Sequence, residues 1–175
     1  MEKITLVTGG ARSGKSGYAL SLADPAENNV FIATAEAVDD EMQQRIERHQ
    51  KERDNRFLTI EAPVHLAQAI CAVKPETRLV IVDCLTVWLG NLLVKDDSGR
   101  LLETEIEALL EILRDPPCRM VIVTNEVGMG IVPMNEMARE FRDQAGWLNQ
   151  SVAALAEEAV FIISGIPMKV KGNNI

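Results

Sequence analysis

Short runs of consecutive apolar residues recur along the chain, and segments with helical spacing separate them. Unbroken, β-branched runs without polar alternation are typical of strands in a parallel sheet that helices cover on both faces. On this basis the pattern predicts five strands. They are Ile4–Thr8, Val30–Thr34, Leu79–Val82, Met120–Thr124 and Val160–Ser164.

Four of the intervening segments have the apolar spacing of amphipathic helices. In the last of them, Ala145, Leu148 and Val152 lie on one stripe that would face a core. Alternation of strands and helices predicts a three-layer α/β domain with a mostly parallel sheet, formed by the whole chain, residues 1–175. The predicted helices are Lys15–Ala23, Asp39–Asp54, Glu103–Arg114 and Glu136–Glu158.

A glycine-rich segment between the first strand and the first helix matches the pattern G-x-x-x-x-G-K-[ST]. Loops of this kind point successive backbone N–H groups at phosphate oxygens, and the lysine places a positive charge on the β- and γ-phosphates. The serine supplies a hydroxyl to Mg²⁺. The motif predicts a P-loop NTPase domain of the RecA-like kind that binds nucleotide. Its residues are Gly9, Gly10, Ala11, Arg12, Ser13, Gly14, Lys15 and Ser16.

Polar residues also follow two other buried strands. Asp83 comes after four apolar residues, as expected for a second Mg²⁺ or nucleotide contact, although an Asp here can also cap a helix that begins near Leu85. Thr124, Asn125 and Glu126 can position water, metal or substrate, or can only satisfy nearby backbone groups. Because ligands of parallel sheets bind beyond the carboxyl ends of the strands, these loops are expected to form one site.

The chain has two histidines. His65 stands where a helix is expected to begin, which favours a solvated or capping role. His49 lies on the same face of a predicted helix as Met42, Ile46 and Arg53. From the residues alone, a partly buried, hydrogen-bonded histidine is favoured over a catalytic one.

Composition narrows the range of partners. The 175 residues carry 18 Lys+Arg against 26 Asp+Glu, a net charge of −8, which disfavours broad binding to nucleic acid or to anionic membranes. No run approaches the length of a membrane span. Cys71, Cys84 and Cys118 are odd in number and widely spaced, so a cytoplasmic protein with reduced thiols is expected, with Cys84 as a packing residue.

Several longer sequence motifs indicate which protein family the chain resembles. The chain resembles the bifunctional adenosylcobinamide kinase / adenosylcobinamide-phosphate guanylyltransferases of cobalamin assembly, from about residue 4 to residue 171. The resemblance is specific, because these motifs stand in order along nearly the whole chain. They are Leu6–Ser16, Asp39–Met42 leading to Arg45 and His49, Val123–Pro133, Ala138–Gln150 and Ser164–Ile166.

The resemblance implies that the enzyme phosphorylates adenosylcobinamide with a nucleoside triphosphate, ATP or GTP. It then transfers GMP from GTP to that phosphate through a guanylylated histidine, here His49, to give adenosylcobinamide-GDP. Mg²⁺ as cofactor and a homotrimer are also implied. Further nucleotide contacts are implied for Ala33, Thr34, Ala35, Gln50, Lys51, Glu52, Arg53, Glu61 and Asp83, and metal contacts for Ser16 and Asp83.

Two alternatives remain open at this point. One is a P-loop small-molecule kinase that never guanylylates its substrate, and the other is a GTP-dependent switch without a substrate. Neither explains the position of His49 after Arg45, and a switch would be expected to carry a base-reading Asn/Thr-Lys-x-Asp motif, which the sequence lacks. The general base of the kinase step is also open, because Asp83 and Glu126 are both candidates.

Overall fold

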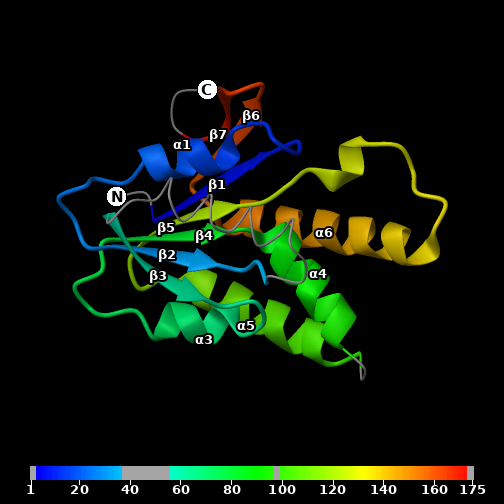
Figure 1. The fold of residues 1–175 in the computed structure, drawn as a ribbon, viewed down its shortest axis with the longest axis horizontal. Coiled ribbons are helices and arrows are strands. Elements are labelled where there is room, and N and C mark those ends of the chain that lie inside the picture. Colours follow the sequence, from blue (N-terminus) through cyan, green and yellow to red (C-terminus); the bar gives the residue numbers. More distant parts are fainter. Residues whose placement is uncertain (1–2, 37–55, 97–98, 173–175) are drawn as a thin grey trace.

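The strands of the chain assemble into one twisted sheet. The computed structural model describes residues 3–36, 56–96 and 99–172, and within them the sheet has seven strands in the order β3-β2-β4-β5-β1-β6-β7 (Figure 1). All neighbours are parallel except β6 and β7. The strands are β1 Ile4–Gly9, β2 Asn29–Ala33, β3 Phe57–Glu61, β4 Leu79–Asp83, β5 Arg119–Val123, β6 Glu158–Ile163 and β7 Ile166–Lys171.

Helices cover both faces of this sheet. One apolar cluster joins β1, β2, β4 and β5 to helices α3, α4, α5 and α6, and a second joins the opposite face to α1 (Figure 1). The predicted three-layer α/β arrangement with a mostly parallel sheet is therefore confirmed. The helices are α1 Lys15–Ser21, α3 Leu66–Cys71, α4 Leu85–Lys95, α5 Leu101–Arg114, α6 Glu136–Leu155 and the short 3₁₀ helix η2 Val127–Met129.

None of the helices in these three ranges has both the length and the apolar composition that a membrane crossing requires.

The five strands expected from apolar runs are all present, but two strands were not expected. β3 and β7 lie at the two edges of the sheet, and most of their side chains are partly or fully exposed. An edge strand with an exposed face has no continuous apolar run, so the pattern that identifies buried strands misses it. The helix expected over Asp39–Asp54 lies outside the described residues.

The last predicted helix is too long at its C-terminal end. α6 stops at Leu155, because Ala156 already has an extended backbone and Glu158 begins β6. The residues after the helix are held by β1, where Glu158, Ala159 and Val160 pair in parallel with Thr5, Leu6 and Val7. Pairing with β1 therefore ends the helix three residues before the predicted Glu158.

Cys84 follows β4 and lies in the apolar cluster under α1. Burial, and after it the negative charge of Asp83, raises the pKa of its thiol to about 11. At pH 8 only about 0.1 % of such a thiol is in the nucleophilic thiolate form. Cys84 is therefore a packing residue, as its sequence context indicates.

We expect Cys84 to be unreactive toward a thiol reagent in the folded protein at pH 8, whereas the exposed Cys71 reacts quickly. Counting the fast-reacting thiols of matched variants tests this. Cys84→Ser should leave the native count unchanged and Cys71→Ser should lower it by one, while both lower the count by one in denaturant. A fast native thiol that disappears in Cys84→Ser would contradict the assignment.

Candidate functional site

The carboxyl ends of six parallel strands meet at one edge of the sheet. In the strand register, Ala33 at the end of β2 pairs with Asp83 of β4 on one side and with Glu61 of β3 on the other. The glycine-rich loop leaves β1 at the same edge, two strands from β4. The structure thus brings the loop and the predicted residues of three other strands to a common edge, as the parallel topology requires.

The loop between β1 and α1 has a backbone that L-residues rarely adopt. Gly9 and Gly14 have positive φ angles of 147° and 100°, and Arg12 has a φ of 55°. A Cβ atom on Gly9 would stand 2.5 Å from the carbonyl oxygen of Ile162, so only glycine fits there. This curled path is the one that a phosphate-binding loop needs in order to turn its amides inward.

Lys15 begins α1 and is only 7 % exposed. Its ammonium donates to the carbonyl oxygen of Gly10 at 2.5 Å and lies 3.5 Å from the Ser13 hydroxyl, so the charge is held within the loop. A buried cation held within a loop of this kind is placed to meet the phosphates of a nucleotide.

The hairpin formed by β6 and β7 packs against this loop. Its turn consists of Ser164 and Gly165, both with positive φ, as two-residue hairpin turns require. The N–H of Gly165 donates to the carbonyl oxygen of Ser13 at 2.8 Å. The antiparallel edge strand, which sequence reasoning missed, is therefore part of the support of the loop.

Asp83 and Ser16 are the candidate metal contacts. Alternation along β4 puts the Asp83 side chain on the same face as Leu79 and Ile81, which is the face that α1 covers. The helix that follows takes no capping bond from a side chain, so capping does not explain Asp83. One carboxylate and one hydroxyl fit a cation of the Mg²⁺ type, which keeps several waters and takes phosphate oxygens as further ligands. The described residues contain no group of three or more metal-ligating side chains.

Thr34 lies after β2, and its hydroxyl is fully used by the protein. It donates to the carbonyl oxygen of Cys84 and accepts from the Cys84 N–H, each at 2.8 Å, and the residue is completely buried. These two hydrogen bonds fix the backbone of Cys84, the residue next to Asp83 at which β4 ends and α4 begins. Contacts from this turn to a ligand are accordingly left to Ala33 and Ala35, which are partly exposed.

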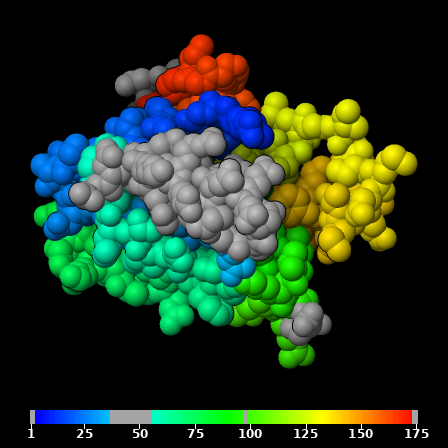
Figure 2. Space-filling model, in the orientation of Figure 1, coloured from blue at the N-terminus to red at the C-terminus, as the bar shows by residue number. Residues whose placement is uncertain are grey.

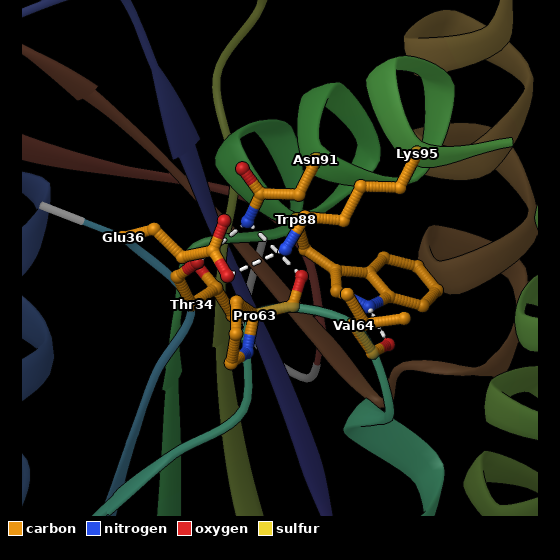
Figure 3. A network of polar contacts seen from close by, with 7 residues as sticks. All are labelled: Thr34, Glu36, Pro63, Val64, Trp88, Asn91 and Lys95. Carbon is orange, nitrogen blue, oxygen red and sulfur yellow. Dashed lines mark hydrogen bonds and ion pairs between the residues drawn. The ribbon is translucent and has the colours of Figure 1, made fainter. Parts of the chain in front are cut away.

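Side chains from α4 hold the loops after β2 and β3 together (Figure 3). Asn91 donates to the carbonyl oxygens of both Thr34 and Pro63, at 2.8 and 3.0 Å. Trp88 donates to Val64 at 2.6 Å, and Lys95 pairs with Glu36 at 2.5 Å. The loop with Ala33 to Ala35 and the loop with Glu61 are therefore fixed relative to each other.

A second polar network lies on the other side of β4, at the end of β5. Glu126 accepts from the hydroxyl of Thr8 at 2.8 Å and from the side-chain amide of Asn149 at 3.3 Å. Asn149 and its partner Thr124 are buried, and Thr86 at the start of α4 completes the network. Sequence reasoning did not single out Asn149, although an amide on the core-facing stripe of α6, between Leu148 and Val152, is a signal of this kind.

The predicted site residues around His49 and the second histidine, His65, remain to be placed. His49, Gln50, Lys51, Glu52 and Arg53 lie outside the described residues. His65 is an exposed residue that contacts Glu105 at 2.7 Å and makes no capping bond, which confirms the solvated role and not the capping one.

Comparison with known proteins identifies the family. The family model "Cobinamide kinase / cobinamide phosphate guanyltransferase" matches residues 5–170. The bifunctional adenosylcobalamin biosynthesis protein CobP of Pseudomonas aeruginosa is 46% identical over 170 residues, 95% of this chain and 96% of that protein. The bifunctional adenosylcobalamin biosynthesis protein CobU of Escherichia coli K12 is 41% identical over 178 residues, covering 95% and 98% of the two chains.

Solved structures add only the fold. An ATP synthase subunit, NeqB, of Nanoarcheaum equitans superposes with a TM-score of 0.51 at 12% identity, over 91% of this chain and 46% of that one. The family match, in contrast, spans nearly the whole sequence, the glycine-rich loop and the network at β5 included. The chain therefore belongs to the cobinamide kinase / cobinamide phosphate guanyltransferase family and is a kinase and guanylyltransferase of adenosylcobalamin biosynthesis.

Proposed function

We propose that both reactions of this enzyme use the one phosphate loop at residues 9–16. In the first, adenosylcobinamide is phosphorylated by the γ-phosphate of ATP or GTP. In the second, GMP from GTP is transferred to the new phosphate through a guanylylated His49, which gives adenosylcobinamide-GDP. The observation that supports this most directly is the buried ammonium of Lys15 inside the curled loop, at the edge that Glu61 and Asp83 also reach.

The chemistry of the proposed intermediate follows from the imidazole. A neutral histidine is a competent nucleophile near pH 7, and its attack on the α-phosphate of GTP forms an N–P bond while the bond to pyrophosphate breaks. The phosphate of the substrate then attacks the same phosphorus and releases His49. The loop amides and Lys15 would stabilise the charge that develops in each displacement.

We propose Gly9 to Ser16, Ala33 to Ala35, Gln50 to Arg53, Glu61 and Asp83 as the nucleotide contacts, and Ser16 and Asp83 as the residues that hold Mg²⁺. The bound cation would neutralise charge on the phosphates. The position of Asp83 on the α1 face, where Ser16 also lies, supports the pair as metal contacts. Because the hydroxyl, N–H and carbonyl oxygen of Thr34 are all bonded within the protein, Ala33 and Ala35 would supply the polar contacts of this turn.

We propose that residues 1–175 form one nucleotide-binding domain of a cytoplasmic enzyme. The single continuous sheet of the described residues supports the first part, and three free cysteines support a reducing compartment.

The guanylyl-histidine is tested with Mg²⁺ and GTP labelled on its α-phosphate. We expect a covalent label on the wild-type protein that is labile in acid and stable in base, and we expect His49→Ala to lose it. His65→Ala is the matched control, because the His65 ring is exposed and pairs with the Glu105 carboxylate, so this variant should keep the label. A wild-type protein that takes up no label but phosphorylates adenosylcobinamide would favour a kinase without guanylyltransferase activity. A wild-type protein that shows neither labelling nor phosphorylation would favour a switch.

Lys15→Ala should reduce both activities at least about a hundredfold, because both displacements need the same positive charge at the phosphates. Separate assays of adenosylcobinamide phosphorylation and of His49 labelling measure this. Lys3→Ala, which removes a surface pair with Asp115, is the control and should leave both unchanged. Kinase activity that survives in Lys15→Ala would contradict the shared loop.

We also propose a homotrimer. The support in the structure is the segment between β5 and α6, which protrudes from the molecule (yellow in Figure 2). It exposes large apolar side chains, among them Ile131 at 96% and Met134 at 99%. Contiguous exposed apolar side chains mark association surfaces.

Light scattering should give a mass three times the 19.3 kDa of the chain. The double variant Ile131→Asp and Met134→Asp should dissociate, because it places charges in the proposed contact. Val94→Asp, at an exposed apolar position on α4, should leave the mass unchanged. A monomeric wild-type protein, or a double variant that stays trimeric, would contradict the proposal.

A further inference from the structure

Glu126 stands between the phosphate loop and the strand of Asp83. β5 lies between β4 and β1 in the sheet, so the residues that follow β5 emerge between these two elements. The N–H of Glu126 donates to the carbonyl oxygen of Gly9, the first residue of the loop, at 3.2 Å. The backbone of Glu126 is thereby attached directly to the loop.

The carboxylate of Glu126 is oriented through one of its two oxygens. Both donors, the Thr8 hydroxyl and the Asn149 amide, are bonded to Oε1, at 2.8 and 3.3 Å. No donor from residues 3–36, 56–96 or 99–172 reaches Oε2. Among these residues, one oxygen is fixed by hydrogen bonds and the other is in a position to accept a proton from a ligand.

The direction of the hydrogen bonds behind Glu126 follows from the groups that can only donate or only accept. The N–H of Asn125 must donate, so the Thr86 hydroxyl accepts it at 2.8 Å and donates onward to Thr124, 3.2 Å away. Thr124 in turn donates to Oδ1 of Asn149 at 2.7 Å. The Asn149 amide then has both N–H groups for the Asn125 carbonyl and for Glu126.

This arrangement defines what Glu126 can do. Thr8 and Asn149 both donate to Oε1, so their two hydrogen bonds fix the direction in which Oε2 points. Asn149 is 7 % exposed, and a buried amide is costly unless each of its polar groups is paired, as they are here. The fold thus uses a complete buried network to present one carboxylate oxygen at the edge of the phosphate loop.

Asp83 lies on the opposite face of the sheet. Its side chain is on the face of α1, with Ser16, whereas Thr8 and Glu126 are on the face of α6, the helix that carries Asn149. In phosphoryl transfer the attacking and leaving oxygens are roughly in line, so the acceptor approaches from the side away from the rest of the nucleotide. Two carboxylates on two faces can therefore serve the cation and the acceptor separately.

We propose that Glu126 is the general base of the cobinamide kinase step, and that Thr8 and Asn149 are positioning residues for it. The proposal rests on the proposed use of the loop at residues 9–16. The substrate hydroxyl gives its proton to Oε2 of Glu126 while its oxygen bonds to the γ-phosphorus and the bond from that phosphorus to the β-phosphate oxygen breaks. The nucleoside diphosphate leaves, and the protonated carboxyl returns its proton to solvent.

The guanylyl transfer does not need this base. His49 attacks as a neutral imidazole, and the acceptor in the second displacement is a phosphate that is already ionised. Glu126→Gln is the sharpest test, because the glutamine oxygen can still accept from Thr8 and Asn149 while the amide nitrogen cannot take a proton. The variant removes the base and keeps the network.

We expect Glu126→Gln to lower kcat of adenosylcobinamide phosphorylation by about 10²- to 10⁴-fold, the usual contribution of a general base. His49 labelling and transfer of GMP to adenosylcobinamide phosphate supplied as substrate should remain at the wild-type level. Loss of all three activities would overturn the proposal in favour of a role toward the nucleotide, and an unchanged kcat would overturn it outright. If the wild type itself forms no label, the guanylyl-histidine fails, while the kinase assay still tests Glu126.

A second variant tests the positioning role. Thr8→Val keeps the shape of the side chain and removes only the donor to Oε1, so kinase kcat should fall about tenfold while KM for the nucleotide and His49 labelling do not change. Thr8→Ser should restore kcat, because it restores the hydroxyl. Equal losses of kcat and labelling in a folded Thr8→Val protein, or no rescue by serine, would show a merely structural role and overturn this part.

Discussion

The peptide groups at the carboxyl ends of buried strands must be hydrogen-bonded, and much of this structure follows from how that is done. Where β2, β4 and β5 end, regular pairing stops inside the protein, and an unpaired buried N–H or C=O group would cost about 1–3 kcal/mol. Helices α4 and α6 supply the missing partners. Asn91 bonds two loop carbonyls, Thr86 takes an amide after β5, and Asn149 takes the carbonyl of that same residue, Asn125.

At this edge of the sheet, the fully hydrogen-bonded turns differ from the glycine-rich loop. At Thr34, Cys84 and Asn125 the polar groups are hydrogen-bonded within the protein. The turns at the ends of β2, β4 and β5 are therefore rigid, and few of their polar groups are available to a ligand. The glycine-rich loop is built differently, because positive φ angles curl it around the Lys15 ammonium. A loop of this form next to rigid turns can hold phosphates in a fixed geometry during the transfer reaction.

The predictability of each part depends on how local its cause is. The five strands with apolar runs are predictable because a strand buried on both faces needs consecutive apolar residues. The glycine-rich loop is predictable because its conformation needs particular residues within eight positions. β3 and β7 were not predicted, because exposed edge strands lack a continuous apolar run. The network of Glu126 was not predicted for another reason: its bonds join residues that are 118 and 23 positions apart in the sequence. The parallel pairing of β1 with β5 and the packing of α6 against the sheet bring them together.

A net charge of −8 also makes the arrangement of the carboxylates matter. A nucleoside triphosphate is itself an anion, so acidic groups near it oppose binding unless a cation or geometry separates them from the phosphates. In the proposed mechanism Asp83 contacts the bound cation, and Glu126 lies across the sheet edge with one oxygen held by neutral donors. Because the two carboxylates lie on opposite faces of the sheet, one can contact the cation and the other the attacking hydroxyl, and neither has to lie directly against the phosphates.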